Sequence, residues 1–269
     1  MMRRSDDWTS LPAEARDAVQ ESIGKVVRAA PVLAGAHCDI AEILTTTEHG
    51  RVFLKGVRLD RREADWWQLR REAMIGPHVG GRLAPRLLAQ AEAGGWTLLA
   101  FEYVTGRHAS FAPDSPDLDH LAAVVRQLQH TDVPDGLFRP VEGRWTAFMP
   151  DPSPLAGDRL LHADLNEGNV LISGGRPYVV DWGMATYGAA WVELAVLIPW
   201  LIRSGHTPAS AEAWAGQFPH WHDPDNDHVT GFADATVAKW LHLLQQGHTE
   251  WKRELLDAAR WWTAWRKGT

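Results

Sequence analysis

The chain has 269 residues, of which 45 % are hydrophobic and 23 % are charged, as is typical of globular proteins. Its net charge of −7 argues against nucleic acid or an anionic membrane as the main partner. A single cysteine excludes an internal disulfide, no apolar targeting run follows the first residues, and the most apolar stretch, 189–202, is too short to span a bilayer. We therefore expect a cytoplasmic monomer or homodimer with no membrane partner.

The first hundred residues predict an alternation of helices and strands. A helix is expected after Ser10 and Pro12, with one apolar face made of Val19, Ile23, Val26 and Val27. Residues 31–43 predict two strands joined by a turn at 35–39, and 51–56 alternate as a further strand. Residues 60–75 have helical spacing, and Gly76-Pro77 is expected to end that helix. Residues 96–106 predict a buried strand that ends at a glycine.

The remainder of the chain predicts mainly helices. Ser115-Pro116 favours a helix start, and an apolar helix is expected from Ala190. Two stretches, 133–158 and 206–228, are predicted to be irregular. The last helix is expected to turn one stripe of residues toward the core, namely Trp251, Leu255, Ala258, Trp262 and Trp265.

One stretch near the middle of the chain brings polar residues to the ends of a predicted hairpin. Strands at 170–172 and 178–180 flank Ser173-Gly-Gly-Arg176, and glycines at both central positions strongly favour a two-residue β-turn. In that register Asn169 falls opposite Val180, within about one rung of Asp181. Two oxygen ligands placed this way suit Mg²⁺, and Asp164 would lie nearby with its carboxylate free.

The order His162-x-Asp164-x-x-x-x-Asn169, followed by Asp181 before Gly183, matches the catalytic loop and metal loop of kinases. The chain here resembles the aminoglycoside phosphotransferase and choline-kinase-like family of the protein-kinase-like fold. The resemblance implies an α+β protein with two lobes: a small antiparallel-sheet lobe at 1–104 that binds nucleotide, and a mostly helical lobe at 105–269 that binds the acceptor.

The resemblance also implies roles for individual residues. Asp164 would be the catalytic base, and Asn169 and Asp181 would hold Mg²⁺. Lys55, on its predicted strand, would bind the phosphates of ATP or GTP and pair with Glu72, for which Glu63 is the competing partner. The nucleotide would also contact the backbone of Gly35, Phe101 and Tyr103.

Two features favour a small-molecule acceptor over a protein. Ala163 replaces the arginine, and Asn166 the lysine, that protein kinases usually carry in this loop, and few residues separate Asp181 from the next apolar helix.

Residues 1–104 have no net charge, whereas 105–269 contain 13 basic and 20 acidic side chains. This excess favours a cationic acceptor such as an aminoglycoside, an antibiotic-resistance role, and acceptor contacts from four acidic residues: Glu193, Asp223, Asp225 and Asp227. An acidic, solubilising surface explains the excess equally well.

Three alternatives remain open on the sequence. The chain could be a nucleotide-binding pseudokinase, or a kinase that acts on a peptide Ser or Thr in natural-product biosynthesis. A metal-dependent hydrolase that uses His162, Asp164 and Asp181 as ligands is a third reading, but it leaves Lys55 and Glu72 unexplained.

Overall fold

The computed structural model describes residues 6–32, 38–60, 63–131, 133 and 139–268. The chain divides into two compact units. Unit 1 comprises 1–107 and 173–184, and unit 2 comprises 108–172 and 185–269. The sequence placed the boundary after residue 104 and did not assign 173–184 to the first unit. That segment joins unit 1 because Val179 N–H donates to Leu83 O at 2.7 Å and Arg176 donates to the carbonyls of Gly81 and Arg82.

Unit 1 is built on a five-stranded antiparallel sheet with the order β1-β2-β3-β5-β4. Its elements are α1 (Ala13–Ile23), β1 (Val26–Pro31), β2 (Ile40–Thr46), β3 (Gly50–Arg58), α2 (Glu63–Val79), β4 (Leu87–Ala93) and β5 (Trp96–Glu102). In β3 and β5, Lys55 lies opposite Leu99 and Phe53 lies opposite Phe101. This register fixes which side chains of the two strands share a face.

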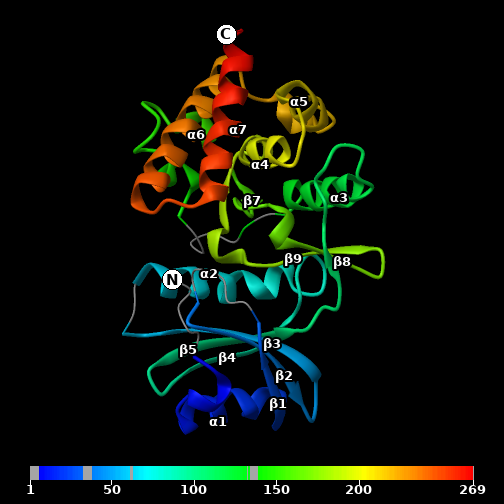
Figure 1. The fold of residues 1–269 in the computed structure, drawn as a ribbon, viewed down its shortest axis with the longest axis vertical. Helices are drawn as coiled ribbons and strands as arrows, with labels where there is room; N and C mark the ends of the chain where they lie inside the picture. The colour runs from blue at the N-terminus through cyan, green and yellow to red at the C-terminus, as the bar shows by residue number, and fades with distance from the viewer. Residues whose placement is uncertain (1–5, 33–37, 61–62, 132, 134–138, 269) are drawn as a thin grey trace. The chain divides into compact units, whose positions relative to one another are not determined.

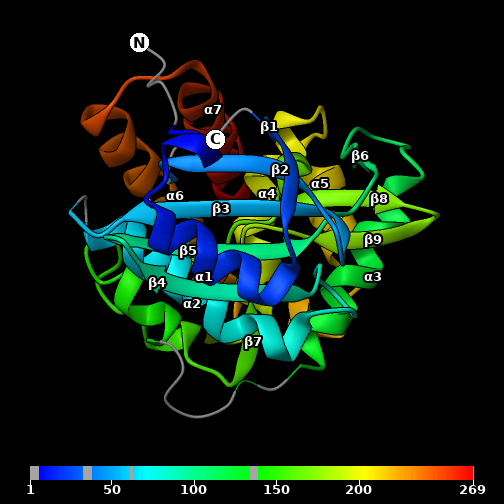
Figure 2. The ribbon, with the colours of Figure 1, turned by 90° about the horizontal axis from the view of Figure 1, so that it is seen from below.

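The two faces of this sheet are covered by different helices. Leu98 and Ala100 pack with α1 residues such as Val19 and Ile23, whereas Leu99 and Phe101 pack with Leu69 and Ala73 of α2. Alternate residues of a strand point to opposite faces, so α1 and α2 lie on opposite sides of the sheet. Figure 1 shows one helix below the sheet and the other above it, and Figure 2 shows α1 crossing in front of β4 and β5.

Two sequence predictions for unit 1 are wrong. Helix α1 ends at Ile23 because Gly24 takes a left-handed φ of 78°, so Val26 and Val27 lie in β1 and not on the helix. Helix α2 does not stop at Gly76-Pro77 but continues to Val79. Pro77 removes one helical hydrogen bond, yet the last turn persists because Ile75 and Val79 are buried.

Unit 2 is mostly helical. Its helices are α3 (Asp117–Gln129), α4 (Trp191–Arg203), α5 (Pro208–Ala215), α6 (Asn226–Gln246) and α7 (Glu250–Lys267). Helix α4 is almost entirely buried and contacts α5, α6 and α7. Helices α6 and α7 lie side by side, drawn in orange and red in Figure 1. The short strands β7 (Arg159–Leu161) and β10 (Thr186–Gly188) pair antiparallel.

The C-terminal half differs from the sequence prediction in two places. The stretch 206–228 is not irregular throughout, because α5, the 3-10 turn Pro219–His222 and the start of α6 lie within it. In α7, Leu255, Ala258 and Trp262 are buried as predicted, but Trp251 and Trp265 are each 43 % exposed. The stripe therefore faces the core only in its middle part.

The predicted hairpin is present. Strands β8 (Val170–Ser173) and β9 (Arg176–Val179) flank Gly174 and Gly175, whose φ angles are 56° and 74°. Positive φ at both positions is what a type I′ turn requires. With β6 (Arg107–His108) these strands form a sheet of order β6-β8-β9. The antiparallel sheet and the helical remainder confirm the predicted α+β class.

Gly157 provides a test of packing in unit 2. A Cβ atom there would collide with the backbone at Gly188 and Ala189, whereas a Cβ at Gly143 would meet nothing within 4 Å. We expect Gly157→Ala to lower the free energy of unfolding by about 1–3 kcal/mol, because the backbone must move apart. Urea denaturation measures this change, with Gly143→Ala as the matched control. Equal stability of the two variants would contradict the close packing at Gly157.

Candidate active site

A buried lysine in unit 1 lies between two carboxylates. Lys55, in β3, has its Nζ 2.5 Å from Oε2 of Glu72 and 3.2 Å from Oδ1 of Asp181. Burial alone would lower the pKa of Lys55, but the two carboxylates raise it above its ordinary value. Burial raises the pKa of Glu72, and the Lys55 ammonium opposes that shift. Lys55 therefore stays positively charged between the two carboxylates.

The three members of the cluster come from distant parts of the chain. Glu72 is buried on α2, while Glu63, the competing partner, instead accepts a hydrogen bond from Trp67 Nε1. Asp181 follows β9 with a φ of 62° and a side chain that is 57 % exposed. Arg71 of α2 donates to Gly183 O at 2.9 Å, which ties the segment after Asp181 to the same helix. The structure thus brings Lys55, Glu72 and Asp181 together.

The other expected nucleotide contacts lie at the end of β5. The ring of Phe101 has its centroid 6.0 Å from Lys55 Nζ, and the guanidinium of Arg51 lies 3.9 Å from the Tyr103 ring centroid. The first contact places Phe101 near the lysine cluster, whereas Tyr103 follows β5 and contacts Arg51 of β3. Backbone hydrogen bonds from Phe101 and Tyr103 to a nucleotide stay a prediction, and Gly35 lies outside the described residues.

In unit 2 the loop after β7 holds Asp164 in a network of amide hydrogen bonds. Asn169 Nδ2 donates to Asp164 O at 2.9 Å and to Asp164 Oδ2 at 3.1 Å. Asn166 also turns inward, because it donates to Asp164 O and accepts from Gly168 N–H, both at 2.9 Å. The amide oxygen of Asn169 is thus the atom of that side chain that suits a cation.

The loop is anchored by a carboxylate that the sequence assigned to the acceptor site. Glu193 on α4 is 1 % exposed and accepts hydrogen bonds from Ala163 N–H at 3.0 and 3.2 Å. Ala163 has a φ of 60°, which alanine adopts rarely, so these bonds hold a strained backbone. The expectation that Glu193 contacts the acceptor is therefore wrong, because its carboxylate is buried against the loop backbone.

The electrostatics of Glu193 follow from this position. Burial raises its pKa to about 7, opposed by hydrogen bonds from the N–H groups of Ala163 and His162. The negative charge of Asp164 raises the pKa further, and the positive charge of Arg144 lowers it. The carboxyl of Glu193 thus titrates near neutral pH, although it is buried.

Comparisons with known proteins agree with this geometry. Residues 112–226 match the sequence model of the phosphotransferase enzyme family, a span that includes the loop at 162–169 and Asp181. The predicted resemblance to that family is confirmed. The fold is similar to that of macrolide 2′-phosphotransferase MphH from Brachybacterium faecium, determined as the apoenzyme, with a TM-score of 0.50 and 19 % identity over 91 % of this chain and 96 % of that one. A comparison with curated proteins found no match.

The fold is therefore the predicted protein-kinase-like fold. Phosphotransferases of this fold generally use Mg²⁺, and the oxygen atoms of Asn169 and Asp181 have the hard-donor chemistry that this ion prefers. Asn169 belongs to unit 2 and Asp181 to unit 1, so their convergence on one ion stays a prediction. Over the described residues, no set of three or more His, Cys, Asp and Glu side chains is arranged to hold a metal, and no helix is long and apolar enough to cross a membrane.

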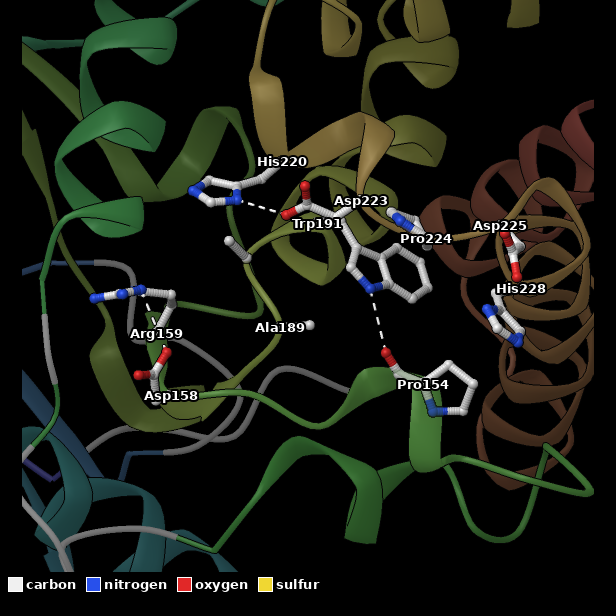
Figure 3. A pocket seen from close by; sticks show the side chains of 11 residues that line it. Pro154, Asp158, Arg159, Ala189, Trp191, His220, Asp223, Pro224, Asp225 and His228 are labelled. Atoms are coloured by element: carbon white, nitrogen blue, oxygen red, sulfur yellow. Dashed lines mark hydrogen bonds and ion pairs between the residues drawn. The ribbon is translucent and has the colours of Figure 1, made fainter.

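Contacts between the acceptor and the remaining predicted residues, Asp223, Asp225 and Asp227, stay a prediction. Asp223 and Asp225 line a pocket of about 450 Å³ in unit 2 (Figure 3). The other polar side chains of this pocket are Asp158, Arg159, His220 and His228. Arg159 belongs to β7, which leads into the Asp164 loop, and Trp191 begins α4. Asp227 is exposed on the first turn of α6 and does not line the pocket.

Sequence reasoning missed two cations near Asp164. Arg144 precedes the buried Trp145 and donates to Ala185 O at 3.1 Å. Ala185 adjoins β10, whose Thr186 pairs with Leu161 immediately before the loop. Lys239 lies on α6. No signal in the sequence could have found either residue, because both reach the loop only through tertiary packing.

The buried state of Glu193 predicts a pH-dependent stability. Its pKa is about 4.5 when unfolded and about 7 when folded, so the folded state binds the proton more tightly between these values. The stabilisation is complete below pH 4.5 and is lost as the pH rises through 7. From pH 5 to 8 the wild type should lose about 2–3 kcal/mol more unfolding free energy than Glu193→Gln, which lacks this titration.

Urea denaturation of both proteins at the two pH values measures this difference. Glu254→Gln serves as the control, because Glu254 is a partly exposed carboxylate paired with Arg203. Parallel pH profiles for the wild type and Glu193→Gln would contradict the assigned shift.

Proposed function

We propose that the protein is a nucleoside-triphosphate-dependent phosphotransferase that moves the γ-phosphoryl group of ATP or GTP to a hydroxyl of a small molecule. The observation that carries this proposal is the Lys55–Glu72–Asp181 cluster. A lysine held between a buried helix glutamate and the aspartate of an Asp-x-Gly segment is the arrangement that binds nucleotide phosphates in kinases. The family match over 112–226 supports the same reaction class.

Each residue of the site would have a separate role in the reaction. Lys55, steered by Glu72, would offset charge on the α- and β-phosphates. Asp164 would orient the acceptor hydroxyl and take its proton. The acceptor oxygen would then form a bond to the γ-phosphorus as the bond from that phosphorus to the β,γ-bridging oxygen breaks. The electron pair of the broken bond leaves on the nucleoside diphosphate. A bound Mg²⁺ would be held by Asn169 and Asp181 and would neutralise phosphate charge.

Local charge restricts how an acceptor can bind. The excess negative charge of 105–269 favours a cationic acceptor such as an aminoglycoside or an amino-alcohol, and the fold likeness adds macrolides to the candidates. Lys239 and Arg144 both interact electrostatically with groups at the Asp164 loop. We therefore propose that the cationic group of the acceptor binds away from the hydroxyl that reacts. Inactivation of an antibiotic, in a protein that works in the cytoplasm, is the role that these candidates imply.

The proposed function predicts which substitutions abolish transfer. Label transfer from [γ-³²P]ATP or GTP should be measured over a panel of aminoglycosides, macrolides and amino-alcohols, with Mg²⁺ present. With the acceptor found this way, Asp164→Asn should lower the turnover rate by about 10²–10⁴-fold, because general-base assistance is lost. Lys55→Met should weaken nucleotide binding, measured as loss of the thermal shift that the nucleotide gives the wild type.

Asp234→Asn is the matched control for Asp164→Asn. Asp234 is an aspartate of α6 paired with Lys267, and its loss should leave transfer unchanged. Comparable turnover in Asp164→Asn and the wild type would remove Asp164 as the base. A nucleotide-induced thermal shift without transfer to any acceptor would favour a nucleotide-binding pseudokinase. Transfer only to a peptide Ser or Thr would identify a peptide kinase.

A further inference from the structure

Lys239 is held in place by an aromatic cluster. Phe232 and Lys239 are seven residues apart on α6 and therefore lie on one face of the helix. The ring of Trp145 contacts both: its centroid lies 4.2 Å from that of Phe232 and 4.6 Å from Lys239 Nζ. The ring of Trp191, from the first turn of α4, packs edge-on against Phe232. The ammonium of Lys239 is thus directed by packing and not by an ion pair.

This ammonium has no carboxylate partner within ion-pair distance in the described part of the chain. The charges that act on it are the carboxylate of Asp164, which attracts it, and the guanidinium of Arg144, which repels it. Burial lowers the pKa of Lys239 to about 8, Asp164 opposes the shift, and Arg144 adds to it. A cation that is partly desolvated and lacks an ion pair is stabilised when an anion binds beside it.

The Asp164 loop, residues 162–169, contains no lysine or arginine that could place a positive charge beside Asp164. Asn166, two residues after Asp164, directs its amide back into the loop, where it bonds Asp164 O and Gly168 N–H. If Asp164 holds the hydroxyl that reacts, the phosphoryl group must arrive within a few ångströms of its carboxylate. Two negative groups then meet, and their approach requires a nearby positive charge.

We propose that Lys239 is a further catalytic residue, whose ammonium binds the oxygens of the phosphoryl group as it passes to the hydroxyl held by Asp164. This inference rests on the proposed function and adds a second lysine, from the acceptor-binding unit, to the reaction. Lys239 exchanges no proton and forms no covalent bond in the step. It offsets the charge that Asp164 and the phosphoryl group bring together.

The first experiment measures the state of Lys239 directly in the full-length protein. Acetic anhydride at pH 8 acetylates the neutral amine, and peptide mass spectrometry reports the rate at each lysine. MgADP with aluminium fluoride, a mimic of the transferring phosphoryl group, should slow acetylation of Lys239 by about fivefold, because a rise of one unit from a pKa of about 8 lowers the neutral fraction at pH 8 from about one half to about one tenth. MgADP alone should have little effect.

Two lysines near Lys239 serve as internal controls. Lys252 donates to the carbonyls of Leu243 and Gly247, and Lys267 pairs with Asp234, so the acetylation rates of both should not change. An unchanged rate at Lys239 in a protein whose melting temperature rises with MgADP and aluminium fluoride would overturn the inference and leave nucleotide binding intact. A protein that shows no thermal shift with any nucleotide and no transfer would overturn both the inference and the proposed function.

The second experiment uses variants with the acceptor found in the screen. Lys239→Met should lower kcat by about 10²-fold with little change in the KM for the acceptor, because the lost contact forms chiefly in the transition state. Lys239→Arg keeps the charge and should recover part of the rate. Lys252→Met is the control and should keep the wild-type kcat. If Lys239→Met keeps the wild-type kcat, or raises KM alone, Lys239 is not a catalytic residue.

Discussion

The arrangement of unit 1 depends on one buried positive charge. Removing an ammonium from water is costly, and the cost is recovered only when carboxylates are held close to it in good geometry. Lys55 meets this condition through Glu72, on a helix that packs on its sheet face, and through Asp181, which lies 126 residues later in the chain. The apolar contacts between β5 and α2 keep that helix in place. The ion cluster is therefore a consequence of the sheet and helix packing, and the partly exposed side chain of Asp181 keeps it accessible to solvent.

Unit 2 uses a buried charge for a different purpose. Among the described residues Glu193 forms no ion pair; it accepts hydrogen bonds from a loop whose Ala163 is in the left-handed region. A strained backbone persists only when its surroundings over-determine it, and here α4 supplies those surroundings because nearly all of that helix is buried. The same anchor fixes the backbone from which Asp164 projects. The loop that carries Asp164, the proposed base, is thus tied by hydrogen bonds to a buried helix.

The sequence predicted those features that depend on local pattern. Gly174-Gly175 predicted the hairpin, and the resemblance to kinases predicted the ion pair between Lys55 and Glu72. Prediction from the sequence failed for features that tertiary packing determines. Helix α2 continues past Pro77 because burial outweighs a lost hydrogen bond, and Glu193 is indistinguishable in sequence from a surface acid of a helix. Lys239 is placed by contact with the Trp145 ring and Arg144 by a hydrogen bond to Ala185 O, and no spacing rule encodes either contact.

The charge of a unit and the charge at its reacting group are different quantities. The acidic excess of 105–269 suggested a cationic acceptor, yet Asp225 immediately precedes α6 and Lys239 lies 14 residues later, about 21 Å along that helix. Exposed charges separated by more than about 8 Å are largely screened at physiological ionic strength, so the Asp225 carboxylate scarcely affects the field at Lys239. Lys239 itself interacts with the charge of Asp164, and Arg144 interacts with that of Glu193, which anchors the Asp164 loop. If Asp164 is the base, as proposed, the charges of a few nearby side chains act on the acceptor at the reacting hydroxyl, whereas the net charge of the unit acts on its approach from solution.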